Sequence, residues 1–407
     1  MILTPLPTEF EQAKPIIETI EAAGYEAYFV GGSVRDTILG KPIHDVDIAT
    51  SAFPAEVKGL FKRTVDTGIE HGTVMILDHG NGYETTTFRT ESGYQDFRRP
   101  DQVTFVRSLK EDLKRRDFTI NALAMRANGE VIDLFDGLAD LKAQVIRAVG
   151  VAEDRFHEDA LRMMRAVRFA SQLRFNIEPA TKQAIADNAP LLSKIAVERT
   201  RVEWEKLLMG QCPDRGIQAL VQTELYRYMP KMATQLPMLE KLIALPAWQL
   251  DSIESTWTLQ AWLMALPDEA AIKQLLKAWK TSNELIDHVT AAWTVMRALQ
   301  RDATLAPMTL FKAGAAALKT ANTVANLLGF GRPQSELVAA YAALPIQDKH
   351  ALAINGGDLL KQQIVQPGPQ MGAVLSQLLV AVVTSQVPNE PEKLLDFARM
   401  VADTENN

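Results

Sequence analysis

Two aspartates separated by one residue are the first candidates for chemistry in this sequence. Asp45 and Asp47 alternate with the apolar residues Val46 and Ile48, a period of two that is typical of a β-strand. On a strand this spacing places both carboxylates on one face, with their Cα atoms about 7 Å apart. Two oxygens at that separation can bind the same divalent ion. The pair therefore predicts a metal site.

A glycine pair upstream of the aspartates indicates a phosphate site. Residues 27–30 predict a short buried strand, residues 31–32 a tight turn of two glycines, and residues 33–39 a helix. Backbone amides in such a turn can approach a phosphate, and the helix N-terminus favours negative charge. Each fragment alone is common in proteins without this chemistry. In this order, with Arg35 on the helix between them, they predict metal-dependent nucleotidyl transfer.

The order of these motifs resembles the DNA polymerase beta-type nucleotidyltransferases, specifically the class II tRNA nucleotidyltransferase and bacterial poly(A) polymerase family. The hallmark of that family is Gly-Gly-x-Val-Arg-Asp followed by Asp-x-Asp, here residues 31–36 and 45–47. Further segments resemble family motifs over about the first 210 residues. They are residues 115–121 (Arg-Arg-Asp-Phe-x-x-Asn), 131–137 (with Leu134 where the family often has proline), 158–162 (Glu-Asp-x-x-Arg) and 194–208.

The resemblance implies an α+β fold in which a polymerase beta-like mixed sheet with helices is followed by an all-α neck, body and tail. A chain of 407 residues is too long for one hydrophobic core. The implied domains are a catalytic nucleotidyltransferase head at 1–150, a helical neck for base recognition at 151–211, a helical tRNA-binding body at 212–330 and a helical tRNA-binding tail at 331–407.

Local patterns predict several elements of the head. They are a helix at 8–23, a helix at 54–61, a hairpin of strands 73–77 and 83–88, and a strand at 145–149 that closes the sheet. Residues 91–102 are polar, contain a glycine and a proline, and predict a long surface loop. In the family a flexible loop at this place is tied to the switch from C to A addition. A plain surface loop is the alternative.

Two further motifs supply candidate site residues. Glu84 lies in the second predicted hairpin strand and matches a third acidic residue of the superfamily, although an outward-facing strand residue would look the same. Arginines 115 and 116 can donate bidentate hydrogen bonds to phosphate oxygens, and we place Arg116 on the nucleotide. Asp117 either orients Arg116 or caps the following turn.

One helix is predicted over residues 158–170, and it carries a charged face. Asp159, Arg162, Arg165 and Arg168 recur every three residues, which favours one slowly drifting side of a helix. A solvated face with intrahelical ion pairs would show the same spacing. Next to a nucleotide, a carboxylate accepts from the amine of cytosine or adenine while a guanidinium donates to the ring nitrogen. Guanine and uracil present the reverse order, and each unpaired group costs about 1–3 kcal/mol.

Taken with the resemblance, these features imply template-independent addition of C, C and A to the 3′ end of tRNA from CTP and ATP, with Mg²⁺ as cofactor. The alternatives are a poly(A) polymerase, an enzyme that adds only CC or only A, and a non-catalytic RNA-binding module. The implied partners are the acceptor and T arms of tRNA. The implied catalytic residues are Asp45, Asp47 and Glu84, of which Asp45 and Asp47 bind metal, and the implied nucleotide-binding residues are Gly32, Arg35, Arg116, Asp159, Arg162, Arg165 and Arg168.

Composition limits the class and the location. The formal net charge of −7 argues against indiscriminate coating of nucleic acid, but a local basic patch can still bind RNA. The single cysteine, Cys212, excludes an intrachain disulfide. The N-terminus lacks a basic region followed by an apolar run, and no stretch is long and apolar enough for a membrane span. We therefore expect a cytoplasmic protein. The sequence leaves both a monomer and a homodimer open.

Overall fold

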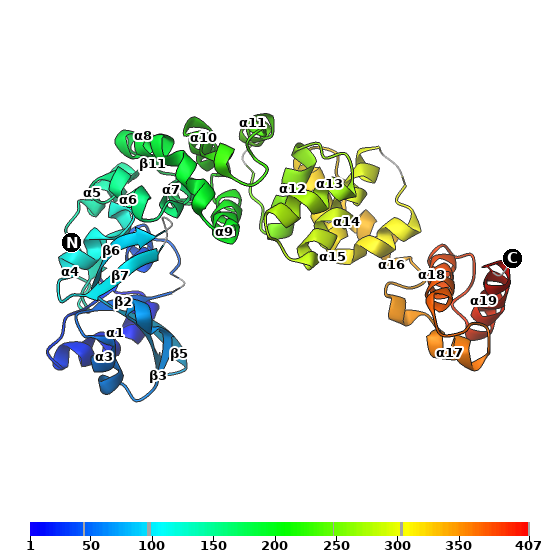
Figure 1. Cartoon of the computed structure of the whole chain (residues 1–407), viewed down its shortest axis with the longest axis horizontal. Coiled ribbons are helices and arrows are strands. Elements are labelled where there is room, and N and C mark those ends of the chain that lie inside the picture. Colours follow the sequence, from blue (N-terminus) through cyan, green and yellow to red (C-terminus); the bar gives the residue numbers. More distant parts are fainter. Residues whose placement is uncertain (44, 96–98, 247, 302–303, 406–407) are drawn as a thin grey trace. The chain divides into compact units, whose positions relative to one another are not determined.

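The computed structural model describes the chain apart from residues 44, 96–98, 247, 302–303 and 406–407. Its internal contacts divide it into two compact units, Met1–Gln249 and Leu250–Asn407 (Figure 1). The first unit holds the strands, and the second is built from helices. The expected α+β head followed by helical domains is confirmed.

A seven-stranded mixed sheet forms the centre of the first unit. In sheet order its strands are β3 (Thr64–Gly68), β4 (Thr73–Asp78), β5 (Asn81–Thr87), β2 (Asp47–Thr50), β1 (Ala27–Val30), β8 (Leu123–Met125) and β9 (Val131–Asp133). Strands β2 and β5 are parallel, and the other neighbours are antiparallel. Ile48 pairs with Thr85, so the preceding residues Asp47 and Glu84 are also neighbours. The predicted hairpin of β4 and β5 is confirmed.

Helices cover the sheet through apolar faces. Helix α1 (Thr8–Ala22) buries Phe10, Ile16, Ile17 and Ile20, and the Phe10 ring lies 4.7 Å from that of Phe29 on β1. The other helices of this unit are α2 (Gly32–Ile38), α3 (Pro54–Leu60), α4 (Leu109–Lys114), α5 (Gly137–Ala143), α6 (Ala152–Glu158), α7 (Leu161–Leu173), α8 (Pro179–Asn188), α9 (Val197–Leu208), α10 (Pro213–Gln222) and α11 (Leu236–Ala244), with 3₁₀ turns η1 (Ile69–His71), η2 (Thr119–Asn121), η3 (Ala189–Lys194) and η4 (Leu225–Tyr228).

The prediction of a long loop at 91–102 is wrong. Strands β6 (Arg89–Gln95) and β7 (Arg99–Phe105) form an antiparallel hairpin across this region. Thr90 pairs with Thr104, and these β-branched residues favour extended backbone. The pairing of β6 with β7 continues from these residues into the polar segment that was expected to be a loop. Residues 96–98, the middle of the predicted loop, lie outside the described residues.

The expectation that residues 145–149 close the main sheet is also wrong. Strand β10 (Val145–Ile146) pairs in parallel with β11 (Asn176–Ile177), in a separate two-stranded sheet. The edge of the main sheet is instead β9. An apolar run predicts a strand, but it does not indicate which other strand will pair with it.

The helix predicted over 158–170 is interrupted. Helix α6 ends at Glu158, α7 begins at Leu161, and Asp159 has extended backbone angles (φ −141°, ψ 103°). An oxygen of the Asp159 carboxylate accepts from the Leu161 N–H at 3.0 Å. Aspartate side chains compete for backbone donors in this way and favour helix ends. Asp159 therefore does not share the helical face of Arg162, contrary to the prediction.

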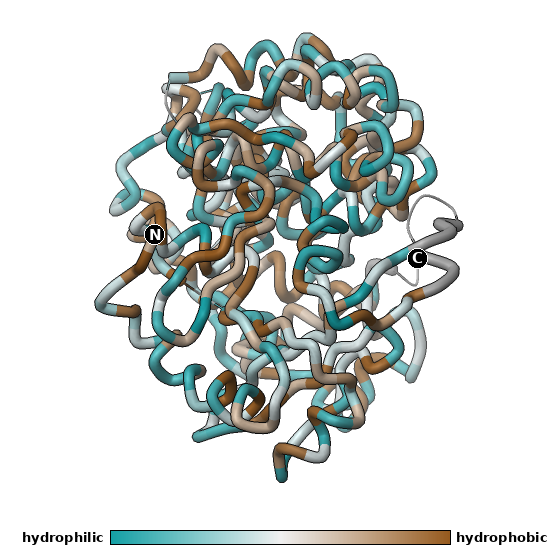
Figure 2. The backbone as a smooth tube through the Cα atoms, turned by 90° about the vertical axis from the view of Figure 1, so that its left-hand side faces the viewer, coloured by the Kyte–Doolittle hydropathy of each residue, from teal (hydrophilic) through white to brown (hydrophobic). Residues whose placement is uncertain are grey.

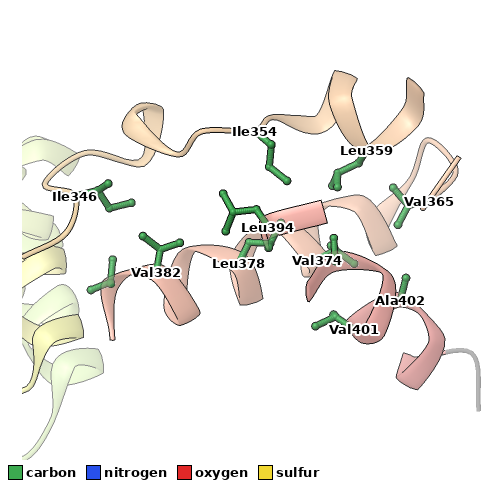
Figure 3. Packing of buried hydrophobic residues seen from close by; sticks show 12 residues of the cluster. Ile346, Ile354, Leu359, Val365, Val374, Leu378, Val382, Leu394, Val401 and Ala402 are labelled. Atoms are coloured by element: carbon green, nitrogen blue, oxygen red, sulfur yellow. The ribbon is translucent and has the colours of Figure 1, made fainter. Parts of the chain in front are cut away.

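The second unit consists of helices with 3₁₀ turn η5 (Lys349–Ala351). They are α12 (Ile253–Leu263), α13 (Glu269–Ala278), α14 (Asn283–Gln300), α15 (Pro307–Leu327), α16 (Gln334–Ala342), α17 (Gly356–Lys361), α18 (Pro369–Val383) and α19 (Pro391–Glu405). Gly314 interrupts α15 with backbone angles (φ 65°, ψ 171°) that favour glycine. Leu359, Leu378 and Leu394 point toward one another from α17, α18 and α19 in a core near the C-terminus (Figure 3).

Hydrophobic and hydrophilic residues alternate in short stretches along the backbone (Figure 2). Among the described residues, no helix is both long and apolar enough to cross a membrane.

Candidate active site

Three of the predicted carboxylates meet at one cavity, which we call the acidic cavity. It has a volume of about 480 Å³ and is lined by Asp45, Asp47 and Glu84, together with Glu9 and Gln12 of α1. Asp45 and Asp47 are exposed, whereas Val46 and Ile48 are buried. The alternation expected from the sequence is thus confirmed, with Asp45 just before strand β2.

The acidic cavity favours a cation. Although the Asp47 side chain reaches solvent, the protein around it excludes part of its water, and this partial desolvation raises its pKa. The Arg116 guanidinium opposes the rise, and the charges of Glu84 and Asp45 add to it. No described residue donates a hydrogen bond to any of the three carboxylates. Carboxylate oxygens are the ligands that Mg²⁺ prefers, so this donor set fits a divalent ion. Within the described residues no three His, Cys, Asp or Glu side chains form a preorganised metal cluster; phosphate oxygens or water would complete the coordination.

A second and larger cavity adjoins the first, and Asp47 lines both. We call it the basic cavity. It has a volume of about 1090 Å³, and nine arginine and lysine side chains line it against five aspartates and glutamates. The basic residues are Arg35, Arg89, Arg115, Arg116, Arg162, Arg165, Arg168, Arg199 and Lys206; the acidic residues are Asp47, Glu70, Glu91, Asp117 and Asp159. A chain of net charge −7 thus carries a local site for an anion.

Glycine is required at the boundary between the two cavities. Gly31 has a φ of 78°, and a Cβ atom there would lie 3.1 Å from Nη1 of Arg116 and 3.9 Å from Oδ2 of Asp47. A side chain there would therefore crowd Arg116 on the side that faces Asp47. Gly32, the first residue of α2, also lines the basic cavity. Both predicted residues, Gly32 and Arg116, are thus at the site.

The aspartate next to Arg116 binds a different arginine. Asp117 is buried and accepts from Nε of Arg165 at 2.7 Å, from the Asn121 amide at 3.0 Å and from the Phe118 N–H at 2.8 Å. Burial opposes its charge, but Arg165, the Asn121 amide and the charge of Arg162 lower its pKa to about 2. Arg116 instead donates to Asp112 at 3.3 Å. The suggestion that Asp117 orients Arg116 is wrong.

The remaining predicted arginines are also held by carboxylates. Arg35 donates to both carboxylate oxygens of Asp36 at 2.9 Å and to the side-chain oxygen Oδ1 of Asn121. Arg168 lies 3.1 Å from Glu203 of α9. Burial lowers the pKa of Arg168 to about 10, with Glu203 opposing the change and Arg165 adding to it. These contacts fix each guanidinium before any ligand arrives.

The predicted base-reading pair is present, but each member has another partner. Asp159 accepts from Arg199 of α9 at 2.7 Å, and Arg162 donates to Glu158 at 2.6 Å and to the Arg115 carbonyl at 2.9 Å. A third donation from Arg162 reaches the Arg155 carbonyl at 3.3 Å. A guanidinium has five N–H groups and a carboxylate has about four acceptor sites. Two Arg162 donors, at Nε and Nη2, and part of the Asp159 acceptor capacity therefore stay available to a base.

Sequence reasoning missed the residues that hold the site together. Arg199 and Glu203 lie in the segment at 194–208, whose resemblance to a family motif assigned them no role, and Asp112 and Glu91 were not singled out. Arg199 lies 40 residues from Asp159 along the chain. The only signal in the sequence was the presence of charged residues in this segment, and the structure shows that Glu203 on α9 is 5% exposed.

Comparison with known proteins identifies the family. The chain is 75% identical, over the full length of both proteins, to the CCA-adding enzyme of Lactiplantibacillus plantarum. It belongs to the CCA-adding enzyme family. A second member, from Limosilactobacillus reuteri, is 56% identical and covers 97% of this chain and 98% of its own.

Family models and solved structures agree with this assignment. Residues 27–147 match the poly A polymerase head domain, 174–236 a probable RNA and SrmB-binding site of polymerase A, and 248–398 a putative tRNA nucleotidyltransferase domain 2. The crystal structure of the Bacillus stearothermophilus CCA-adding enzyme in complex with CTP matches with a TM-score of 0.86 at 40% identity, covering 98% of this chain and 99% of that one. The Thermotoga maritima CCA-adding enzyme complexed with tRNA shares the fold, with a TM-score of 0.62 at 22% identity over 98% and 97% of the two chains.

Proposed function

We propose that this protein adds C, C and A to the 3′ end of tRNA without a nucleic-acid template, using CTP and ATP and releasing pyrophosphate. The observation that carries the proposal is the position of Asp47, which lines both the acidic and the basic cavity. A cation held by the carboxylates would thus lie beside a triphosphate held by the arginines.

Asp45 and Asp47 are the proposed ligands of Mg²⁺, with Glu84 as a neighbouring carboxylate in the same cavity. Bound Mg²⁺ would lower the pKa of the RNA 3′-hydroxyl and neutralise charge on the triphosphate and the leaving pyrophosphate. Arg35, Arg116, Arg165 and Arg168 bind the nucleotide and hold its α-phosphorus in line with that hydroxyl, and Gly32 permits close approach of the backbone. The hydroxyl gives up its proton to water, its oxygen bonds to the α-phosphorus, and the bond to pyrophosphate breaks.

Asp159 and Arg162 are the proposed readers of the base. The carboxylate accepts from N4 of cytosine or N6 of adenine, and a free N–H of Arg162 donates to N3 or N1. Uracil and guanine would set a carbonyl oxygen against Asp159 and an N–H against Arg162. Each unpaired group costs about 1–3 kcal/mol, which excludes UTP and GTP.

The tRNA partner and the location are part of the same proposal. The match of residues 174–236 to an RNA-binding site and of 248–398 to a tRNA nucleotidyltransferase domain supports tRNA binding by the helical part. We retain a head at 1–150, a neck at 151–211, a body at 212–330 and a tail at 331–407 as the functional division. The substrate class supports a cytoplasmic location.

A primer-extension assay tests the proposal. A tRNA transcript that ends at its discriminator base is incubated with the protein and Mg²⁺, and with CTP, ATP, UTP, GTP or CTP plus ATP. We expect two additions with CTP, one further addition when ATP is also present, and none with UTP or GTP. A long ladder with ATP alone would instead indicate poly(A) polymerase. Binding without extension would indicate a non-catalytic RNA-binding module.

A further inference from the structure

Three guanidinium groups of the basic cavity gather around one aromatic ring. The central carbons of Arg168, Arg35 and Arg165 lie 4.3, 5.2 and 5.4 Å from the centre of the Phe169 ring. Cations within about 6 Å of an aromatic face are attracted by its negative quadrupole. Phe169 itself lines the basic cavity. The Glu-Asp-x-x-Arg motif at 158–162 assigns no role to Phe169.

Phe169 is held rigidly. It is 4% exposed, and the ring of Phe118, which is fully buried, packs edge-on against it at 5.8 Å and 87°. Edge-to-face packing of this kind is a favoured arrangement of two rings. The ring therefore presents a fixed face to the guanidinium groups.

The ring also connects two parts of the first unit. Arg35 comes from α2, directly after the glycine turn, whereas Arg165 and Arg168 come from α7 with Phe169 itself. Of these three contacts with the ring, the one made by Arg35 therefore joins two different helices. It ties the cation beside the Gly31 turn to the helix that carries Arg162.

Asp36 and Glu203 pair with Arg35 and Arg168, and the Phe169 ring restrains both guanidinium groups further without adding a charge. A guanidinium on an aromatic face keeps its N–H donors in its own plane, where they can bind phosphate oxygens. Burial lowers the pKa of Arg168 to about 10, and the neighbouring Arg165 and Arg35 contribute to this change. A bound anion would relieve that repulsion.

We propose that Phe169 is a positioning residue whose ring aligns Arg35 and Arg168 to bind the triphosphate of the incoming nucleotide. The inference rests on the proposed function, because it assigns the two arginines to the nucleotide. It predicts that the ring affects nucleotide binding through the phosphates, independently of the base.

The test compares Phe169→Leu with wild type and with a matched control, Phe175→Leu. Phe175 is 2% exposed, follows α7, and has no guanidinium over its ring among the described residues. KM and kcat are measured for CTP, and inorganic pyrophosphate serves as an inhibitor that lacks a base. For Phe169→Leu we expect KM for CTP and the inhibition constant of pyrophosphate to rise about fivefold to tenfold with kcat within about twofold.

The control separates positioning from folding. Phe175→Leu should lower the thermal midpoint while KM and the pyrophosphate constant stay at the wild-type values. If Phe169→Leu does not fold, Phe169→Met takes its place, because methionine fills a similar apolar volume without a ring. Unchanged constants in the Phe169 variant, or an equal rise in Phe175→Leu, would overturn the inference. A wild-type protein that adds no nucleotide would refute the proposed function itself.

Discussion

The two cavities that share Asp47 differ in how their charged side chains are held. In the acidic cavity, Asp45, Asp47 and Glu84 receive no hydrogen bond from any described residue. In the basic cavity every lining arginine has a carboxylate partner. The difference matches two kinds of ligand. A small cation supplies its own strong attraction and needs only free oxygens, whereas a long nucleotide requires donors that are already oriented.

The largest expected effect comes from removing a charge in the acidic cavity. Asp47→Asn keeps the size of the side chain but removes a proposed metal ligand, so single-turnover addition of CTP should slow by about 10³-fold or more. Binding of tRNA, measured separately, should not change. The control is Asp66→Asn, on an exposed residue of β3 that pairs with Lys58 at 3.0 Å, which should keep wild-type activity. A rate for Asp47→Asn within tenfold of wild type would refute the metal assignment.

A smaller effect is expected from the base-reading side of the basic cavity. Arg162→Ala removes the proposed donor to the ring nitrogen, so preference for CTP over UTP should fall about 10-fold to 100-fold, by more than CTP turnover falls. The measurement is kcat/KM for both nucleotides. Arg215→Ala is the control, because Arg215 bonds the Arg174 carbonyl at 2.9 Å and does not line the basic cavity. Undiminished exclusion of UTP by Arg162→Ala would count against template-like recognition.

The ion pairs that hold the arginines of the basic cavity should contribute to the free energy of unfolding. The pKa of Asp117 is about 2 in the fold against about 3.9 in an unfolded chain, so Asp117→Asn should lose about 2 kcal/mol at pH 7. Because the folded pKa is the lower one, this contribution is complete above about pH 4 and disappears as the pH falls toward 2. The difference in urea midpoint between the variant and wild type should therefore be nearly the same at pH 7 and pH 4 and clearly smaller at pH 3. A constant difference across this range would refute the role of the Asp117 charge.

The smallest effect has the opposite sign. The pKa of Asp47 is raised, so its ionisation destabilises the fold, and this cost grows as the pH rises through that pKa. In EDTA at pH 7, Asp47→Asn should therefore raise the thermal midpoint slightly and not lower it. Adding Mg²⁺ should stabilise wild type by mass action, and the variant much less. If Asp47→Asn is less stable than wild type in EDTA, the ionised Asp47 carboxylate does not destabilise the metal-free fold, and the proposed difference between the two cavities is wrong.

Local patterns predicted the local structure around the acidic cavity well. The alternation of Asp45 and Asp47 with buried neighbours, the glycine turn and the β4–β5 hairpin each depend on residues close in sequence. Their periods follow directly from strand and helix geometry. The resemblance then added residues distant in the chain, such as Arg116, which lines the basic cavity together with Asp47.

Partners could not be predicted in the same way. Asp159 and Arg199 are 40 residues apart, Asp117 and Arg165 are 48 apart, and no spacing rule links them. The break at Asp159 was also missed. Recurrence every three residues favoured one helix, whereas the aspartate side chain captured a backbone donor and ended it.

The helix that carries Arg162, Arg165, Arg168 and Phe169 lies between two recognised segments. The head-domain match ends at residue 147 and the RNA-binding match begins at 174, and α7 spans Leu161–Leu173. Asp159 is moreover held by Arg199 of α9. Recombination near residue 147 would thus separate the proposed metal ligands from the proposed base-reading residues. Recombination near residue 174 would separate Asp159 from Arg199, which holds it. A chimera that exchanges heads between relatives must carry α7 and α9 along with the sheet to inherit an intact nucleotide site.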